Sequence, residues 1–189
     1  MYKKYQPIWR IAQGHLRLAV RKNFVVHTIG AIKAMELLLT REKGDHSLLM
    51  PAVILHDVGW SAVPFDLQRS KNRTKQLQAL RLHLVLARPI IREILGQLNY
   101  PSLKIKKIIK IVVAHKFKNP RDRNKRLLID ADNLSEVFKK QFYNDVAAYR
   151  TTPRRLYQFR QDNHFYTQTA RLVFLQELAR RKKEIMKLN

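Results

Sequence analysis

Apolar residues recur along most of this chain at intervals of three and four positions, the spacing that places them on one face of an α-helix. No segment alternates between apolar and polar residues in the way that marks a half-buried strand. Glycine and proline are sparse, with five and seven residues, and no internal repeat or low-complexity linker interrupts the pattern. The pattern therefore predicts an all-α protein.

The expected helices are separated by turn-forming residues and polar clusters. They span about 8–21, 24–41, 47–58, 74–98, 101–116 and 125–150, followed by a helix that restarts after residue 151 and a last one at about 165–187, in which Leu172, Leu175 and Leu178 form the apolar face. Thr152 and Pro153 suit the N-cap and first turn of the restarted helix. Gly59 is expected to end the third helix, and residues 60–73 and 116–124 are expected to be loops.

Several histidines and aspartates interrupt the apolar faces of these helices. They are His27, His56, Asp57, His83, His115, Asp130 and Asp132. Each alone has an ordinary structural explanation, because a histidine on an apolar face is more often a hydrogen-bonded core residue than a ligand. Taken together they indicate a metal site, since helical bundles build such sites from side chains on facing helices. The chain has no cysteine, so the ligands would be nitrogen and oxygen atoms, which suit Fe, Mn, Mg, Ni, Co or Zn.

The order of His27, the pair His56–Asp57 and Asp132 resembles the H…HD…D signature of the HD superfamily of metal-dependent phosphohydrolases, over roughly residues 20–140. The resemblance implies an HD-domain-like helical bundle with additional C-terminal helices. We accordingly expect residues 1–150 to form the HD-type domain and residues 151–189 a basic extension packed on it. Asp132 matches the last ligand of the family better than Asp130, because "ADNL" reproduces the short polar residue and leucine that follow it. Asp130 is expected to support the ligands from behind or to cap a helix.

His83 and His115 lie between the HD pair and the last aspartate, as in family members with the pattern H…HD…H…H…D that bind two ions. The resemblance then implies that the first ion is bound by His27, His56, Asp57 and Asp132. His83 and His115 would bind the second, with Asp57 bridging the two and acting as the catalytic carboxylate. Order and length are similar to those of bacterial HD proteins that hydrolyse dinucleoside tetraphosphates. One or two divalent ions, and their identity, remain open.

The reaction implied by the resemblance is hydrolysis of a phosphate ester or anhydride of a nucleotide or related phosphorylated small molecule by metal-activated water. The chain departs from the family at one position. Many members carry a lysine or histidine soon after HD-x-Gly, placed to contact phosphate, whereas Trp60 follows Gly59 here. A cation that binds the substrate phosphate must therefore come from another segment.

Net charge is the outstanding feature of the composition, with 38 Lys and Arg against 14 Asp and Glu, or +24. Such an excess favours anionic partners, namely phosphorylated small molecules, nucleic acid or anionic lipid, although solvated basic faces explain it equally well. The segment 69–126 carries much of this charge. Within it, Arg81, Arg88, Lys116 and Lys118 are expected to contact substrate phosphate. The alternative function is a basic polyanion- or RNA-binding regulatory protein on an HD scaffold without turnover.

The absence of cysteine excludes disulfides and makes a reducing, cytoplasmic location the simplest expectation. No apolar stretch approaches the roughly 18 residues of a membrane span, and the N-terminal segment lacks the continuous apolar core of a signal peptide.

A third hypothesis treats all the histidines as satisfied core residues. It predicts that chelators leave the thermal stability unchanged. The sequence does not indicate an oligomeric state.

Overall fold

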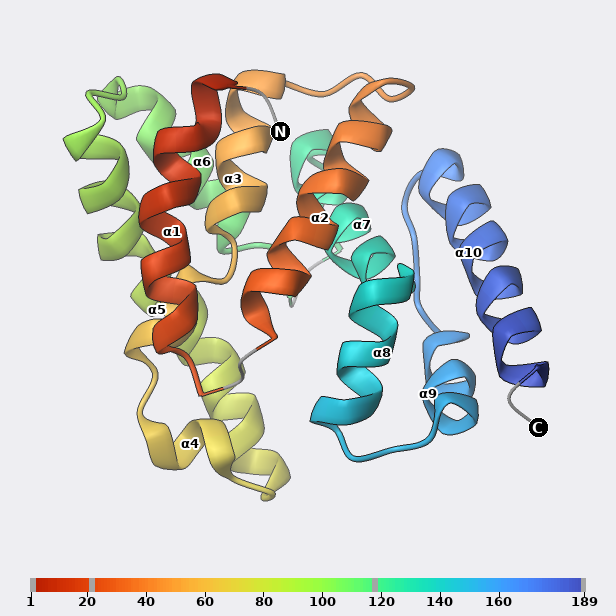
Figure 1. The fold of residues 1–189 in the computed structure, drawn as a ribbon. Coiled ribbons are helices and arrows are strands. Elements are labelled where there is room, and N and C mark those ends of the chain that lie inside the picture. The colour runs from red at the N-terminus through yellow and green to blue at the C-terminus, as the bar shows by residue number, and fades with distance from the viewer. Residues whose placement is uncertain (1–2, 21–22, 117–118, 188–189) are drawn as a thin grey trace.

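The computed structural model describes residues 3–20, 23–116 and 119–187, and every regular element in these ranges is helical, which confirms the all-α prediction. The elements are η1 (Lys3–Tyr5), α1 (Gln6–Leu18), α2 (Phe24–Leu39), α3 (His46–Leu55), η2 (Val58–Ala62), α4 (Phe65–Arg69), α5 (Arg73–Gln97), α6 (Ser102–Val112), α7 (Arg123–Ser135), α8 (Lys139–Ala148), α9 (Pro153–Arg160) and α10 (Gln168–Met186), with η marking 3₁₀ turns (Figure 1).

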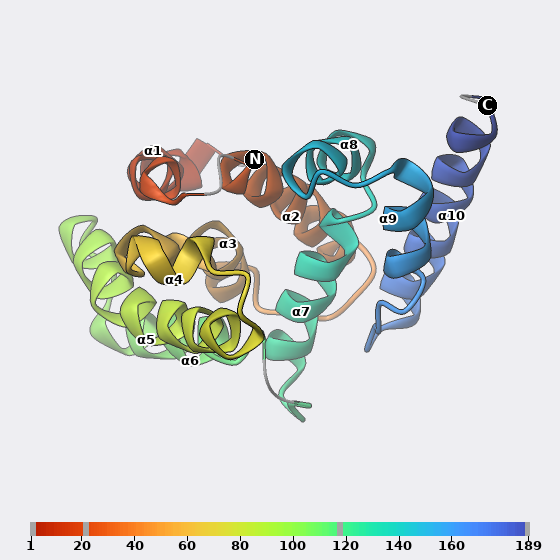
Figure 2. The same cartoon turned by 90° about the horizontal axis from the view of Figure 1, so that it is seen from below.

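The helices are arranged in two outer layers with a buried pair between them. Figure 2 shows α1, α2 and α8 along one side, α5 and α6 along the other, and α3 and α7 between them. Helices α9 and α10 lie at one edge of this arrangement (Figures 1 and 2). One hydrophobic cluster runs through the layers and includes residues of α1, α2, α3, α5, α6, α7 and α10.

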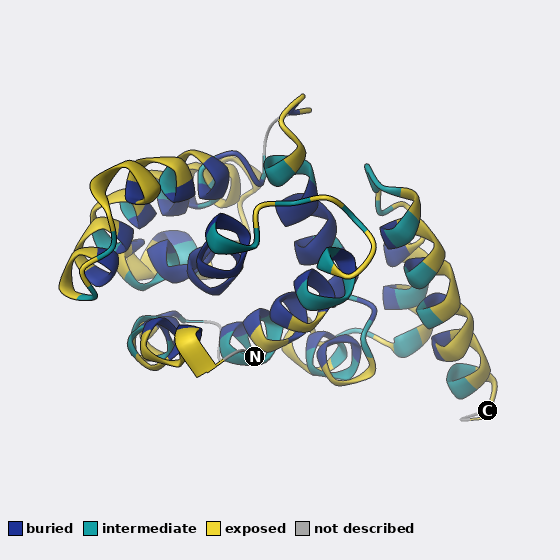
Figure 3. Cartoon of the chain, turned by 90° about the horizontal axis from the view of Figure 1, so that it is seen from above, coloured by how far each residue is buried: buried dark blue, intermediate teal, exposed yellow. Residues whose placement is uncertain are grey.

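Helix α3 is the most deeply buried element (Figure 3). All residues from Leu48 to Leu55 are buried, including Pro51 within the helix. A helix that is apolar on all sides has to be enclosed by neighbours, and α2, α6, α7 and α1 surround it. Asp45 caps its first turn, with its Oδ1 accepting a hydrogen bond of 2.9 Å from Ser47 N. The end of α3 therefore delivers the next two residues, His56 and Asp57, to the centre of the molecule.

Gly59 does not cap α3 in the way that the sequence suggested. No described glycine has a positive φ, and Gly59 lies inside the 3₁₀ turn η2. A Cβ atom at Gly59 would lie 2.0 Å from the carbonyl oxygen of His83 and 2.8 Å from the amide nitrogen of Ala87. Only glycine permits this contact, so Gly59 allows η2 to pack directly on the backbone of α5.

Two other helix predictions need correction. Residues 60–73 are not a continuous loop, because they contain the end of η2 and the short helix α4. The expected single helix over 125–150 is two helices, α7 and α8. Three successive bonds of the i→i−3 type, at residues 136–138, tighten and end α7 there. No proline or glycine marks this break, so its position could not be inferred from the sequence.

The C-terminal helices begin as expected but α10 buries a different face. The Thr152 side chain accepts a hydrogen bond from Arg155 N and so caps α9, as predicted. In α10 the buried apolar residues are Ala170, Phe174 and Leu178, which belong to the main core. Leu172 and Leu175 of the predicted stripe are each 50% exposed. The division of the chain at residue 150 remains a prediction. Among the described helices, none is long and apolar enough to cross a membrane.

Candidate metal centre

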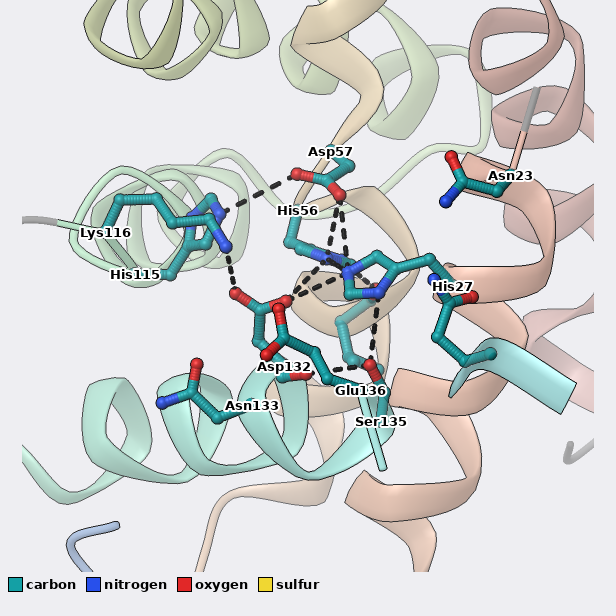
Figure 4. A network of polar contacts seen from close by, with 12 residues as sticks. Asn23, His27, His56, Asp57, His115, Lys116, Asp132, Asn133, Ser135 and Glu136 are labelled. Carbon is teal, nitrogen blue, oxygen red and sulfur yellow. Dashed lines mark hydrogen bonds and ion pairs between the residues drawn. The ribbon is translucent and has the colours of Figure 1, made fainter. Parts of the chain in front are cut away.

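Six of the histidines and aspartates selected from the sequence meet at one place inside the bundle (Figure 4, where five of them are labelled). They are His27 from α2, His56 and Asp57 after α3, His83 from α5, His115 after α6 and Asp132 from α7. His27 is slightly accessible, with 11% of its side chain exposed, and the other five are buried. The fold therefore brings together residues that lie up to 105 positions apart in the sequence.

The first group contains His27, His56 and Asp57, whose potential ligand atoms all lie within 4.8 Å of one another. His27 Nε2 is 3.1 Å from His56 Nε2 and 3.5 Å from Asp57 Oδ2. Asp132 adjoins this group, since its Oδ1 is 2.9 Å from His27 Nε2 and 3.6 Å from His56 Nε2. Two nitrogen and two oxygen atoms thus face one point.

The second group contains Asp57, His83 and His115, again with potential ligand atoms within 4.8 Å of one another. The Nε2 atoms of His83 and His115 each lie 3.8 Å from Asp57 Oδ1. Asp57 is common to the two groups and presents a different oxygen to each. This is the relation between the HD aspartate and two sets of histidines that the sequence predicted.

Hydrogen bonds at the opposite nitrogen orient three of the imidazoles. His56 Nδ1 lies 2.8 Å from the carbonyl oxygen of Val53, and His115 Nδ1 lies 2.6 Å from that of Val112. A carbonyl only accepts, so each Nδ1 carries a hydrogen, and the Nε2 atom of each ring faces the cluster. For His27, Nδ1 lies 3.1 Å from Ser135 Oγ. That hydroxyl donates to the carbonyl of Asp132, so it accepts from His27.

Several buried atoms of the cluster are left without a hydrogen-bond partner. Asp57 Oδ1, His83 Nε2, His115 Nε2 and Asp132 Oδ1 are buried and have no hydrogen-bond partner among the described residues. Buried polar atoms in native proteins are normally partnered. Cations bound by the two groups would satisfy these atoms, and imidazole nitrogens with carboxylate oxygens are suitable ligands for a divalent metal. The residues present therefore fit the metal ions that the sequence implied.

Comparison with known families agrees with this geometry. A family profile described as "HD domain" matches residues 24–136, more than half of the chain. The chain belongs to the HD-domain family. The family consists generally of metal-dependent hydrolases, and together with the cluster this supports divalent-metal binding. No curated protein matches the chain, and no solved structure does.

Protonation in this HD domain differs between the two groups. Burial lowers the pKa of His56, but Asp57 and Asp132 outweigh it and raise the pKa to about 10. Burial and the neighbouring His115 lower the pKa of His83 to about 3, and burial also lowers that of His115. Without a metal, the first group therefore holds a proton on His56, whereas the two histidines of the second group, His83 and His115, are neutral at pH 7.

The carboxylates of the HD domain stay ionised in this environment. Burial alone would raise the pKa of Asp57, but His56 and the other histidines hold it well below the usual value. Burial is likewise outweighed at Asp132, where Lys116 makes the largest opposing contribution. The ammonium of Lys116 pairs directly with Asp132 Oδ2. Burial opposes its charge, but Asp132 and Asp57 raise the pKa of Lys116 above its ordinary value.

Trp60, the residue at which the chain departs from the family pattern, supports the centre from the side. Its ring stacks on His83 with the centroids 4.6 Å apart and the planes at 9°. Its other neighbour is Phe24, with ring centroids 5.6 Å apart. Trp60 thus holds the His83 imidazole in place, and the cation near the centre is Lys116 instead.

Three of the other predicted site residues lie elsewhere, and one is not described. Arg81 and Arg88 are exposed on the outer side of α5, whereas His83 faces inward, so the structure does not place them at the centre. Lys118 lies outside the described residues.

Asp130 does not support the ligands. Its carboxylate accepts hydrogen bonds from Tyr166 N and from the amide and hydroxyl of Thr167, at 2.6–2.8 Å. Asp130 therefore holds the start of α10, because Thr167 caps that helix.

A cavity of about 120 Å³ opens beside the centre. Its lining comprises three residues of the centre (His27, Asp57 and Lys116), three apolar residues (Phe24, Trp60 and Leu80) and a further group of Asn23, Glu136, Gln141, Asp145 and Tyr149. Sequence reasoning missed this last group. Gln141 and Asp145 are four positions apart on α8 and both buried, a spacing that places them on one helix face. That pairing of polar residues was the one available signal.

Proposed function

We propose that this HD domain is a metal-dependent phosphohydrolase that cleaves a phosphate ester or anhydride bond of a nucleotide or related phosphorylated small molecule. One observation carries the proposal. The Asp57 carboxylate lies between two sets of histidines, and buried Nε2 and carboxylate atoms around it have no hydrogen-bond partner among the described residues. Such atoms are stabilised by divalent cations, and hydrolysis of phosphate esters and anhydrides is the chemistry that the family supports.

The donor atoms suggest how the ions are shared. His27, His56, Asp57 and Asp132 would hold one ion, and Asp57, His83 and His115 a second, with Asp57 as the bridge. A bound divalent ion polarises phosphoryl oxygens and lowers the pKa of water toward neutrality. The chain's own contribution is to keep Asp57 ionised and to fix the imidazoles through their Nδ1 hydrogen bonds, so that the donor atoms need little reorganisation.

Lys116 is the residue best placed to attract the substrate phosphate. It lines the cavity and lies beside Asp57 and Asp132. Among the described residues that line this cavity, it is the one lysine, and there is no arginine. Its pairing with Asp132 would weaken when Asp132 binds a metal ion, which would leave the ammonium for a phosphoryl oxygen.

The apolar part of the cavity supports an organic phosphate as the substrate. Phe24, Trp60 and Leu80 line the cavity together with the charged residues. Pockets for nucleotides and similar molecules combine apolar walls with a few well-placed polar groups. Inorganic phosphate compounds would make no use of such a wall, so we favour a nucleotide.

The test is a metal analysis combined with a phosphate-release screen. Elemental analysis of the purified protein should find a transition metal, and nucleotides supplied with Mn or Fe should release phosphate. His56→Ala and Asp57→Ala should abolish metal content and activity together. Chelation should lower the melting temperature of the parent protein, because a ligand that binds only the folded state stabilises it. A metal-free protein that releases phosphate from no nucleotide would refute the proposal.

A second candidate function rests on the outer surface. Exposed lysines and arginines cover the outer sides of α5 and α6, among them Arg88, Arg92, Lys104, Lys107 and Lys110. These helices lie side by side along one face (Figure 2). A polyanion such as RNA would bind this surface with a strong dependence on salt. Binding of a mixed-sequence RNA that does not weaken between low and high salt would exclude it.

A further inference from the structure

One residue that lines the cavity carries a buried acceptor without a donor. Gln141 of α8 lines the cavity and is 3% exposed. Its Nε2 donates a hydrogen bond of 2.7 Å to Asp145 Oδ1. Its Oε1 is buried and has no hydrogen-bond partner among the described residues. A buried acceptor without a partner destabilises a protein, so such an atom beside a cavity points to a ligand that donates to it.

The orientation of the Gln141 amide is fixed by its neighbours. Asp145 Oδ1 also accepts from Asn23 Nδ2 at 2.8 Å, and Asp145 Oδ2 accepts from Arg160 Nη2 at 2.8 Å. Because a carboxylate with these partners acts as an acceptor, the Gln141 nitrogen and not its oxygen must face Asp145. Oε1 is therefore the free end of the amide, and Asp145 acts as its positioning residue.

Charge around Gln141 excludes a phosphate group as the missing partner. Asp145 and Glu136 both line the cavity here, and one guanidinium, that of Arg160, binds the two carboxylates. An unprotonated phosphate oxygen only accepts, and it would face the Gln141 oxygen with carboxylates behind it. The partner must carry an N–H or O–H group. Phe24 and Trp60, stacked in the same cavity, offer a flat apolar surface to a ring bearing that group.

We propose that Gln141 determines substrate specificity by accepting a hydrogen bond from the nucleoside part of the substrate, either a sugar hydroxyl or a base amine. The inference rests on the proposed function, since it assigns the organic part of the same substrate. The phosphate end then lies toward Lys116 and Asp57, and the nucleoside end lies toward α8. The two ends of the substrate are thus recognised by opposite kinds of group. Cations bind the phosphate end, and a hydrogen-bond acceptor binds the nucleoside end.

The first experiment uses the unmodified protein and varies the ligand. Calorimetry would compare the binding of adenosine 5′-monophosphate with that of its 2′-deoxy, 3′-deoxy and 6-deamino analogues. The analogue that lacks the relevant donor should bind about tenfold more weakly, because the buried Oε1 then stays unpaired. This arm also identifies the donor as a hydroxyl or an amine. Equal affinity for all four compounds, or no binding of the parent nucleotide, would overturn the proposal.

The second experiment removes the acceptor. Gln141→Met keeps the length of the side chain and should weaken adenosine monophosphate binding by the same factor while abolishing discrimination among the analogues. Gln176→Met, at an exposed position of α10, is the matched control and should behave like the parent protein. Discrimination that persists in Gln141→Met would contradict the assignment. If this variant does not fold, the analogue series on the parent protein still decides.

Failure of the recognition proposal is separable from failure of the proposed function. Hydrolysis of p-nitrophenyl phosphate, whose ring carries no donor, tests the phosphohydrolase alone. Hydrolysis of that compound together with equal binding of all four nucleotides would refute the role of Gln141 only. Absence of hydrolysis of that compound and of every nucleotide in the screen, together with selective nucleotide binding, would refute the enzymatic function and retain the recognition site.

Discussion

Two clusters of buried charge contribute residues to the lining of one cavity, and they are stabilised in different ways. Around Arg160, each carboxylate has a cationic partner, at 2.6 Å for Glu136 and 2.8 Å for Asp145. Around Asp57, several buried atoms lack a hydrogen-bond partner among the described residues, and they belong to three different side chains besides Asp57 itself. The Arg160 cluster, apart from Arg160 Nε and the Gln141 oxygen, is complete within the chain. In the Asp57 cluster, Lys116 pairs with Asp132, but Asp57 Oδ1 and the Nε2 atoms of His83 and His115 are left for a cation from outside.

Buried polar residues thus have two different roles in this protein, one structural and one in binding. Both clusters place ionised groups where burial opposes their charge, and both depend on residues distant in sequence. A cluster that is paired internally contributes to the architecture, because removing one partner exposes the other to the full cost of burial. A cluster that lacks internal pairing has the properties of a binding site. Substitutions in the Arg160 cluster should therefore lower the stability, and substitutions in the Asp57 cluster should lower the metal content.

The largest expected effect is on metal content and activity. Asp57→Asn should lower hydrolytic activity by at least about 10³-fold and remove most of the bound metal, because Asp57 serves both groups of histidines. Asp145→Asn, in the other cluster, should retain the metal. Elemental analysis and phosphate release measure the two effects. The comparison fails if Asp57→Asn binds as much metal as Asp66→Asn, which alters an exposed aspartate of α4.

The next effect concerns the stability of the Arg160 cluster. Arg160→Met should reduce the free energy of unfolding by about 3 to 5 kcal/mol, because Glu136 and Asp145 are left without their buried cation. Denaturant unfolding measures it. Arg154→Met, at an exposed position of the same helix, should change the stability by less than about 0.5 kcal/mol. A similar loss of stability in both variants would show that the buried ion pairs do not stabilise the fold more than an exposed arginine does.

A smaller loss of stability is expected at Gly59. Gly59→Ala should destabilise the protein by about 3 kcal/mol, because the new methyl group collides with the backbone of α5 and cannot be relieved by a rotamer change. Gly14→Ala is the control. No atom lies within 4 Å of a Cβ there, and alanine favours the helix by about 0.5–1 kcal/mol. Thermal unfolding of the two variants should therefore shift in opposite directions. A neutral Gly59→Ala would disprove the close contact.

The smallest effect is the release of the His56 proton when a metal binds. A histidine whose pKa is raised to about 10 stabilises the metal-free fold below its unfolded value of 6.5, and this contribution is lost as the pH rises toward 10. A metal that binds His56 must displace that proton. Near pH 7.5, metal binding should release about one proton, seen as a dependence of the calorimetric heat on the ionisation enthalpy of the buffer. No dependence in the parent protein would contradict the assigned pKa.

The site was accessible to sequence reasoning because its members are unusual where they stand. His27 and His83 interrupt otherwise apolar helix faces, His115 follows the apolar residues that end α6, and the HD pair follows a fully apolar run. Their convergence and the resemblance reinforced each other. Asp130 misled because it lies only two positions before Asp132 in the same stretch, "LLIDADNL". Two positions along a helix rotate the side chain by about 200°, toward α10 in this case.

The remaining features depend on tertiary contacts that leave no local trace. The break between α7 and α8 has no breaker residue, and Arg160 is one arginine among many in a chain of charge +24. Its burial between Glu136 and Asp145 arises only when α9 packs on α8. Arg81 and Arg88 show the converse error. Proximity in sequence to His83 suggested a role at the centre, but the helix turns them outward.

The contact of Gly59 with α5 has a consequence for the selection of metal ions. Gly59 follows Asp57 by two residues, and the His83 carbonyl that it touches belongs to a residue of the second histidine group. Main-chain atoms in contact therefore set the spacing between the shared carboxylate and that imidazole, so rotation of side chains can adjust it little. A chain that built the same centre with a larger residue at this position would have to displace α5 outward together with His83. Such a centre would be wider and would favour larger ions.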